Sequence, residues 1–211
     1  MAAAIVDHQL RSNTHKTYDV HFFGDSIHTT VTHDPDIVTQ WISDLGSGHR
    51  IVGLDVEWRP VFKRNARHPA ATLQLCVARR CLIFQLIHAP TVPSSLVGFL
   101  SNSEYTFVGV GIKSDLKKIG KDYDGLGLDA KTVDLRSLAA EVYERKELKN
   151  SGVKGLTKVV LEKEVQKPRG VTMSRWDKRW LKPDQVQYAC LDAFVCYEMG
   201  RILNAFGSTN S

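Results

Sequence analysis

The sequence predicts an α/β protein with a mixed sheet of about five to six strands and helices on both faces. Three observations predict this class. Short apolar segments with strand spacing follow one another before Pro93, and strand and helix patterns alternate after it. Hydrophobic residues make up 43% of the 211 residues, which is enough for one buried core. Consecutive strands favour antiparallel pairing, whereas alternating strands and helices favour parallel pairing through crossovers.

The N-terminal part of the chain is predicted to begin with a hairpin. Gly24-Asp25 separates two strand patterns, at 17–23 and 27–32. Asp34-Pro35 then provides an N-cap and a first helical residue, and Gly46 ends that helix. The helix has one apolar face, made of Ile37, Val38, Trp41, Ile42 and Leu45. Three more strands are expected, at 51–56, 71–77 and 81–86.

The C-terminal part is predicted to alternate between helices and strands. Strands are expected at 106–110 and near 132–133. Helices are expected at 94–101, 113–123, 135–144, 153–161 and from 183 to about 206. The segment 163–182 is expected to be a long basic loop. We therefore divide the chain into a flexible N-terminal arm (1–16), one folded domain (17–206) and a tail (207–211).

Composition excludes several classes of protein. No apolar run is long enough for a membrane span, and the first residues lack the basic start of a secretory signal. The four cysteines (Cys76, Cys81, Cys190 and Cys196) lack metal-site spacing, so we expect reduced thiols. These features predict a cytoplasmic protein, with the nucleus as the alternative location.

Positive charge is concentrated in one segment. The whole chain has 28 basic and 23 acidic residues, a net charge of +5. The segment 163–182 alone has seven basic and two acidic residues, which gives the same surplus, 7 − 2 = +5. Such a patch indicates either a polyanionic partner or an ordinary solvated face, and charge alone favours neither.

Two acids stand in the apolar strand at 51–56 and just beyond it. Asp55 and Glu57 are two residues apart, so the strand period places both carboxylates on one face at its carboxyl end. Two buried carboxylates repel each other unless a cation lies between them, and oxygen ligands favour Mg²⁺ or Mn²⁺. The alternative is an edge strand whose acids face solvent. Taken alone, the pair favours that alternative.

Each of three further residues, taken singly, fits either a functional or a purely structural role. Asp115 follows an apolar strand and a glycine turn, where an acid also stabilises a helix N-terminus. Two glycines precede it, but the third glycine of a dinucleotide-binding motif would fall at Ser114. Tyr188 and Asp192 lie four residues apart on one face of the last helix, where a carboxylate could simply satisfy a buried hydroxyl.

Taken together, the five residues form a recognisable set. The chain resembles the DEDDy branch of the DEDD 3′-5′ exonucleases, which have an RNase H-like fold, and most of all the Werner-type exonuclease domains. Asp-Val-Glu-Trp (55–58) matches the first motif, Val-Gly-Val-Gly-Ile-Lys-Ser-Asp (108–115) the second, and Tyr-Ala-Cys-Leu-Asp-Ala (188–193) the third. The related branch has a histidine at the position of Gln187, so that branch is excluded. The resemblance covers residues 17–206.

The resemblance implies a mechanism. Asp55, Glu57, Asp115, Tyr188 and Asp192 would be catalytic, and the four carboxylates would hold two divalent cations, Mg²⁺ or Mn²⁺. The carboxylates of Asp55, Glu57 and Asp192 would hold the first cation. Asp55 would bridge to the second cation, and Asp115 would help to hold that cation through water. Tyr188 would orient the attacking water, because a phenol is a poor base at neutral pH. The product would be a nucleoside 5′-monophosphate.

Basic and aromatic residues after the first motif and before the third are predicted to bind the nucleic acid. These residues are Trp58, Arg59, Lys63, Arg64, Arg67, Lys167, Arg169, Arg175, Trp176, Lys178 and Arg179. For Trp58 we favour packing in the core over stacking on a base. For Trp176 the two roles are evenly balanced.

The expected substrate is single-stranded nucleic acid with a free 3′ end. In length and lack of appended modules the chain is similar to the plant RISC-interacting clearing exoribonucleases. This similarity implies RNA as the substrate, Argonaute proteins as partners and a homo-oligomer. The alternatives are a Werner-like DNA exonuclease in repair, an inactive nucleic-acid-binding module and an RNase H-type endonuclease.

Overall fold

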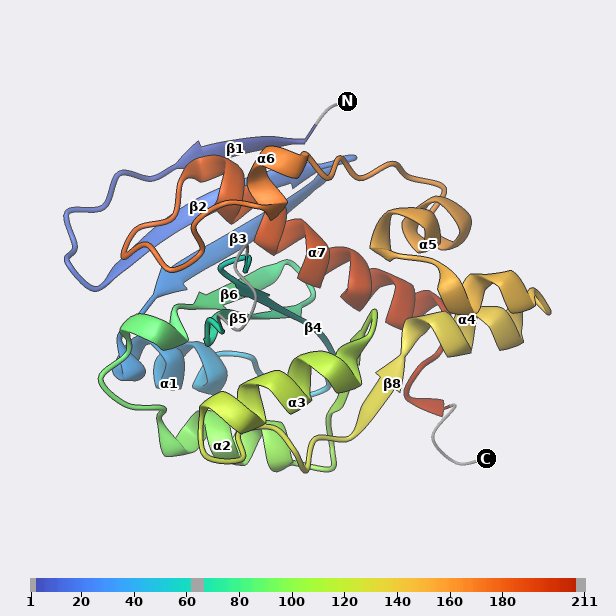
Figure 1. Cartoon of the computed structure of the whole chain (residues 1–211), viewed down its shortest axis with the longest axis horizontal. Helices are drawn as coiled ribbons and strands as arrows, with labels where there is room; N and C mark the ends of the chain where they lie inside the picture. The colour runs from blue at the N-terminus through green and yellow to red at the C-terminus, as the bar shows by residue number, and fades with distance from the viewer. Residues whose placement is uncertain (1–2, 62–66, 208–211) are drawn as a thin grey trace.

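A mixed sheet of eight strands runs through the part of the chain that the structure, a computed structural model, describes: residues 3–61 and 67–207 (Figure 1). The strand order is β1-β2-β3-β6-β5-β4-β7-β8. Helices cover both faces, so the predicted fold class is confirmed. The predicted number of strands was too low, since it omitted β1 and left the size of the sheet at five to six.

The first three strands form an antiparallel unit at one edge of the sheet. β2 (His15–Phe22) and β3 (Asp25–Thr32) make the predicted hairpin, and its turn residues Phe23 and Gly24 both have positive φ, 47° and 89°. β1 (Ala4–Asp7) pairs antiparallel with β2. The expectation of a loose arm over residues 1–16 is therefore wrong for 4–7, a stretch too short to show a clear period, and for 15–16, which begin β2.

The centre of the sheet joins antiparallel and parallel strands. β4 (Ile51–Trp58), β5 (Ala70–Val77) and β6 (Arg80–Phe84) pair antiparallel in sequence order, and β6 also pairs parallel with β3. On the other side, β7 (Thr106–Gly109) and β8 (Thr132–Asp134) continue from β4 in parallel. Parallel pairing after Pro93 is therefore as expected, whereas the parallel pair of β3 and β6 lies before Pro93, where antiparallel pairing was expected.

Helices divide between the two faces, each with its own hydrophobic core. One face packs against α1 (Pro35–Ser43), α2 (Ser94–Ser101) and α3 (Ile112–Asp122). The other packs against α4 (Leu135–Val142), α5 (Val153–Val160), α6 (Arg169–Thr172) and α7 (Pro183–Ile202). Short 3₁₀ helices occupy Leu86–His88 and Lys146–Asn150.

Two details differ from the sequence-based expectation. The basic segment 163–182 contains the short helix α6, and α7 ends at Ile202 rather than near residue 206. Among the described residues, no helix combines the length and apolarity that crossing a bilayer requires.

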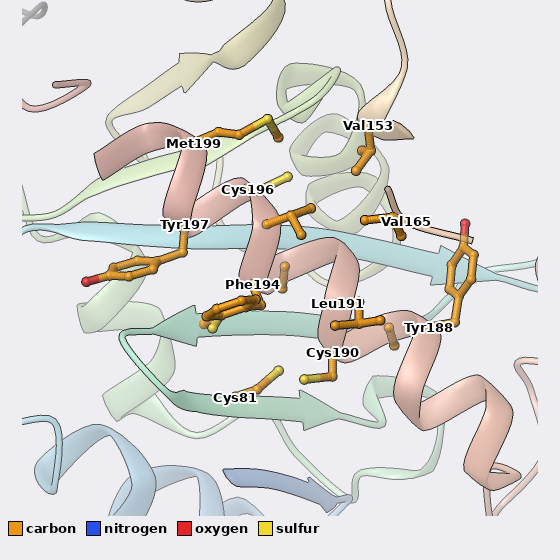
Figure 2. Packing of buried hydrophobic residues seen from close by; sticks show 14 of the residues in the cluster. Cys81, Val153, Val165, Tyr188, Cys190, Leu191, Phe194, Cys196, Tyr197 and Met199 are labelled. Carbon is orange, nitrogen blue, oxygen red and sulfur yellow. The ribbon is translucent and has the colours of Figure 1, made fainter. Parts of the chain in front are cut away.

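Helix α7 lies directly on β4 (Figure 2). A Cβ atom at Gly53 would stand only 2.0 Å from the carbonyl oxygen of Ala193 and 2.7 Å from the backbone nitrogen of Tyr197. Several of the buried residues of this helix are small, among them Ala189, Cys190 and Cys196. The helix therefore approaches the sheet closely, and this approach depends on a glycine in the strand.

Candidate active site

The end of β4 turns two carboxylates toward α7. Alternate residues of this strand, Val52, Leu54 and Val56, belong to the core under α1, α2 and α3. The intervening residues Asp55 and Glu57 therefore face the opposite side, where Gly53 touches α7. The pairing register with β5 shifts between Glu57 and Trp58, so the regular strand ends just after the second acid.

Helix α7 adds the third carboxylate. Asp192, only 2% exposed, lies next to Ala193, the residue that contacts Gly53. One ligand oxygen from each of Asp55, Glu57 and Asp192 lies within 4.8 Å of the others. Two of these acids each have a buried oxygen, Asp55 Oδ2 and Asp192 Oδ1, that no described residue hydrogen-bonds. Clustered oxygens that lack donors fit a hard divalent cation such as Mg²⁺ or Mn²⁺.

The three acids also shift one another's pKa values. Burial raises the pKa of Asp55 well above its ordinary value, and the charges of Asp192 and Glu57 raise it further. Burial, followed by the charge of Asp192, raises the pKa of Glu57 to about 8. Burial also raises the pKa of Asp192, although Lys167 opposes this shift. Without a cation the cluster therefore holds carboxylates that resist ionisation.

This electrostatic cost predicts a pH-dependent stability difference. Because the pKa of Glu57 is raised from 4.5 to about 8, its ionisation destabilises the fold progressively as pH rises through that window. Glu57→Gln cannot ionise and escapes the loss. In a metal chelator, the melting temperature of Glu57→Gln relative to wild type should rise by on the order of 5 °C between about pH 5 and about pH 8.

Thermal unfolding followed by circular dichroism measures this difference. The matched control is Glu141→Gln, which removes the same charge from an exposed position on α4. Its difference from wild type should stay flat over the same pH range. If the melting-temperature difference between Glu57→Gln and wild type also stays constant with pH, ionisation of Glu57 does not destabilise the fold.

Asp115 lies in the first turn of α3, outside the group of three. Burial and then the charge of Asp134 raise its pKa to about 7, and its charge in turn raises the pKa of Asp55. Asp134 anchors this region, since its carboxylate accepts hydrogen bonds from the Gly111 nitrogen at 3.2 Å and from Arg136 at 2.7 Å. Asp115 thus lies outside the group of three but near enough for its charge to act on Asp55.

Tyr188 stands one helical turn before Asp192 and is 8% exposed. Figure 2 shows it at one end of the row of α7 side chains, on the side of Val165. Burial, together with the nearby charge of Asp192, holds the pKa of its phenol far above the ordinary value. The hydroxyl therefore keeps its proton and can donate a hydrogen bond.

Lys167 is where the structure departs most from expectation. It was predicted to bind the nucleic-acid backbone, but its Nζ lies 2.5 Å from Asp192 Oδ2 and 5.0 Å from the centre of the Tyr188 ring. The basic segment before α7 therefore reaches into the carboxylate cluster itself.

Two polar residues of β5 also belong to the site, and the sequence analysis passed over them. Gln74 is opposite Asp55 and Thr72 is opposite Glu57 in the sheet register, and both side chains are fully buried. The Gln74 Nε2 donates to Thr72 Oγ1 at 2.6 Å. Two polar residues at alternate positions in an otherwise apolar strand could have revealed this polar strip.

The predicted strand-binding residues have varied surroundings. Asp177 pairs with Arg59 at 3.2 Å and with Arg175 at 3.0 Å, so it joins the segment after β4 to the basic segment before α7. Arg67 pairs with Asp122, and Arg179 donates to His33 Nε2 at 3.1 Å. Side chains of Arg169 and Lys178 are exposed. Lys63 and Arg64 fall outside the described residues.

The structure buries Trp176 and leaves Trp58 partly exposed. Trp176 is fully buried, contacts the Tyr188 ring and donates to the Thr172 carbonyl at 3.3 Å, so it cannot stack on a base. Trp58, for which we favoured core packing, is 36% exposed, with Lys118 Nζ 4.9 Å from its ring. Trp176 instead supports Tyr188, and Trp58 is the ring that a base can reach.

Comparisons with known proteins agree with this geometry. A family model described as 3′-5′ exonuclease matches residues 29–205. A 3′-5′ exonuclease of Arabidopsis thaliana is 34% identical over 160 residues, covering 74% of this chain and 54% of the relative. The mouse (Mus musculus) bifunctional 3′-5′ exonuclease/ATP-dependent helicase WRN is 31% identical over 189 residues, covering 89% of this chain and 13% of the relative.

Solved structures share the fold. The Nibbler EXO domain of Aedes aegypti superposes with a TM-score of 0.67 at 18% identity, covering 85% of this chain and 88% of that one. Escherichia coli RNase D gives 0.66 at 17% identity, covering 84% and 45% respectively. The chain thus spans about half the length of the Arabidopsis relative and a small part of the mouse protein.

Proposed function

Since the chain belongs to the family of 3′-5′ exonucleases, we propose that it removes nucleoside 5′-monophosphates from the 3′ end of single-stranded nucleic acid, with divalent cations. The observation that carries this proposal is the gathering of Asp55, Glu57 and Asp192 within 4.8 Å, beside Tyr188. Acids on a strand and a distant helix converge there, with buried oxygens that no described donor satisfies.

The reaction is hydrolysis of the last phosphodiester. A water oxygen bonds to phosphorus, the bond from phosphorus to the 3′ oxygen of the preceding nucleotide breaks, and that oxygen leaves with a proton. Tyr188, which keeps its proton, would orient the water. Mg²⁺ or Mn²⁺ at the carboxylates would make that water more acidic and offset charge on the phosphoryl oxygens.

The proposed arrangement has two cations. Asp55, Glu57 and Asp192 would hold one, Asp55 would also contact the second, and Asp115 would reach it through water. Four carboxylates and two divalent cations sum to zero charge, so the loaded site no longer repels a phosphodiester.

We propose RNA as the preferred substrate. Escherichia coli RNase D, which shares this fold, is an exoribonuclease involved in structured RNA processing. The exposed Trp58 and the basic residues around Asp177 would contact the strand on either side of the cluster. The alternative is DNA as the substrate, in the manner of a Werner-like repair enzyme.

One digestion experiment tests the activity and the substrate together. RNA and DNA oligonucleotides of one sequence, labelled at the 5′ or the 3′ end, are incubated with Mg²⁺, Mn²⁺ or a chelator. We expect a ladder from 5′-labelled RNA, immediate release of mononucleotide from 3′-labelled RNA, and no cleavage in chelator. Internal cuts would indicate an endonuclease, and faster cleavage of DNA would favour the repair enzyme. Tight binding without products would indicate an inactive nucleic-acid-binding module.

The proposal extends to the oligomeric state, partner and location of the protein. We propose a cytoplasmic homo-oligomer that clears RNA fragments beside Argonaute proteins, on the strength of the likeness to the RISC-interacting exoribonucleases. All four cysteines are buried free thiols, which suits a reducing compartment. Light scattering of the purified protein tests the oligomer, and co-purification with a tagged Argonaute tests the partner.

A further inference from the structure

Lys167 contacts two residues of the proposed active site, Asp192 and Tyr188. Its ammonium lies 2.5 Å from Asp192 Oδ2, and its side chain is 26% exposed while that of Asp192 is 2% exposed. It also approaches the face of the Tyr188 ring to 5.0 Å. A positive charge therefore stands among the oxygens that fit a cation.

The ammonium of Lys167 keeps its charge in this position. Burial works to lower its pKa, but the charges of Asp192, Tyr188 and Asp55 outweigh burial and hold that pKa above its usual range. Its charge also acts on Asp55 and Glu57, lowering the raised pKa values of both carboxyls. In the protein without cations, Lys167 thus partly neutralises three of the acids.

A divalent cation and this ammonium compete for the same carboxylate. Asp192 belongs to the group of three that fits a cation; its Oδ2 accepts from Lys167, and its Oδ1 has no described donor. Two cations on one carboxylate repel each other, so a metal ion bound at Asp192 favours release of the ammonium. The lysine stem is flexible, and residues 163–168 form no helix or strand, so nothing in the regular secondary structure fixes its position.

The displaced charge has a natural second partner. Two divalent cations neutralise the four carboxylates. With Lys167 also present, the site then has a net charge of +1. The scissile phosphodiester has one negative charge and gains more at its phosphoryl oxygens as water attacks. A lysine between Asp192 and Tyr188 is within reach of that phosphate, because both residues would flank the reacting water.

We propose that Lys167 alternates between two partners: it pairs with Asp192 before cations bind, and then donates to a non-bridging oxygen of the scissile phosphate during hydrolysis. The second position rests on the proposed exonuclease function, whereas the first is a property of the protein alone. Lys167 keeps its proton throughout and acts by charge and hydrogen bonding.

Binding of Mn²⁺ to the free protein, followed by calorimetry, tests the first position. Lys167→Met keeps the stem and removes the competing charge, so Mn²⁺ affinity should rise by roughly tenfold. Lys163→Met is the matched control, because Lys163 lies on the same segment but pairs with Asp25 at 3.6 Å. Its Mn²⁺ affinity should equal that of wild type. Unchanged or weaker Mn²⁺ binding by Lys167→Met would overturn the exchange, since a lysine that merely positions Asp192 predicts weaker binding.

Turnover at saturating Mn²⁺ tests the second position. Lys167→Met should lose about 10²-fold in kcat with little change in KM, because the contact strengthens as charge develops on the phosphate. A loss confined to KM would make Lys167 an ordinary strand-binding residue. If wild type releases no mononucleotide, the proposed function fails together with this second position, while the Mn²⁺ measurement still decides the first.

Chemical rescue distinguishes the effect of losing the ammonium from any effect of the substitution on the fold. The four native cysteines are buried, so Lys167→Cys introduces an accessible thiol that 2-bromoethylamine can alkylate, restoring an ammonium on a stem of similar length. Alkylation should recover about tenfold or more of the lost kcat and weaken Mn²⁺ binding again. An alkylated variant that stays as slow as the untreated one would overturn the phosphate contact.

Discussion

Asp55→Asn is expected to abolish hydrolysis and, in chelator, to raise the melting temperature. Asparagine fills the same space but removes one of the charges that the buried cluster holds together. Losing a shared cation ligand removes several kcal/mol of transition-state stabilisation, which corresponds to a rate loss of roughly 10³-fold to 10⁵-fold. Relief of repulsion around a fully buried carboxyl should add about 1–3 kcal/mol of stability near pH 8.

The order of stability should reverse when Mn²⁺ is added. Wild type gains stability in proportion to the cation it binds, whereas Asp55→Asn, with one ligand missing, gains little. Melting temperatures measured with and without Mn²⁺ show this crossing. The control is Asp129→Asn, which removes the same charge from an exposed loop position. Its rate of hydrolysis and its melting temperatures with and without Mn²⁺ should equal those of wild type. Normal turnover by a well-folded Asp55→Asn protein would end the assignment of this site.

Gly53→Ala is expected to be among the most damaging substitutions in the fold. The added methyl group would lie 2.0 Å from the Ala193 carbonyl oxygen and 2.7 Å from the Tyr197 nitrogen, both of them backbone atoms that cannot turn aside. Helix α7 has to move away from β4, at a cost of about 3–5 kcal/mol in the free energy of unfolding. Asp192 moves with the helix, so Mn²⁺ binding should weaken even where the protein still folds.

Denaturant unfolding and Mn²⁺ titration check both effects. Gly98→Ala is the control, because Gly98 lies within α2 with open space around the added Cβ. That variant should be more stable than wild type by about 0.5–1 kcal/mol, as alanine is the better helix former. Similar stability for the two variants would show that α7 does not depend on a glycine in β4.

The sequence predicted elements wherever a local signal was strong. Asp34-Pro35 marks the start of α1, and Gly24-Asp25 marks the hairpin between β2 and β3; both are found there. The predicted helix at Ser94–Ser101 has those same bounds. Caps, turns and a periodic apolar face depend on neighbouring residues, so one sequence suffices to find them.

Features set by distant contacts were missed or misplaced. β1 has four residues and becomes a strand because β2 offers a free edge, which no local pattern reveals. The parallel pairing of β6 with β3 joins segments about 50 residues apart. Each tryptophan was placed by its neighbours in sequence, yet burial of Trp176 depends on the α7 face that carries Tyr188.

The candidate site shows the same division. Spacing placed Asp55 with Glu57 and Tyr188 with Asp192, and the fold brings Asp55, Glu57 and Asp192 together. Lys167 was assigned to the nucleic-acid backbone because its segment is basic. Its actual partner is Asp192, 25 positions further along the chain. Charge composition indicates that a segment attracts anions, but only the folded backbone decides which anion a given lysine meets.

The wide separation of the cluster's members has a consequence for synthesis of the protein. Asp55 and Asp192 are 192 − 55 = 137 positions apart, and the helix that carries Asp192 and Tyr188 is the last regular element among the described residues. A nascent chain emerging from the ribosome therefore lacks a complete cation-binding set until α7 has been translated. A complete set of cation ligands would therefore arise only when α7 docks on β4.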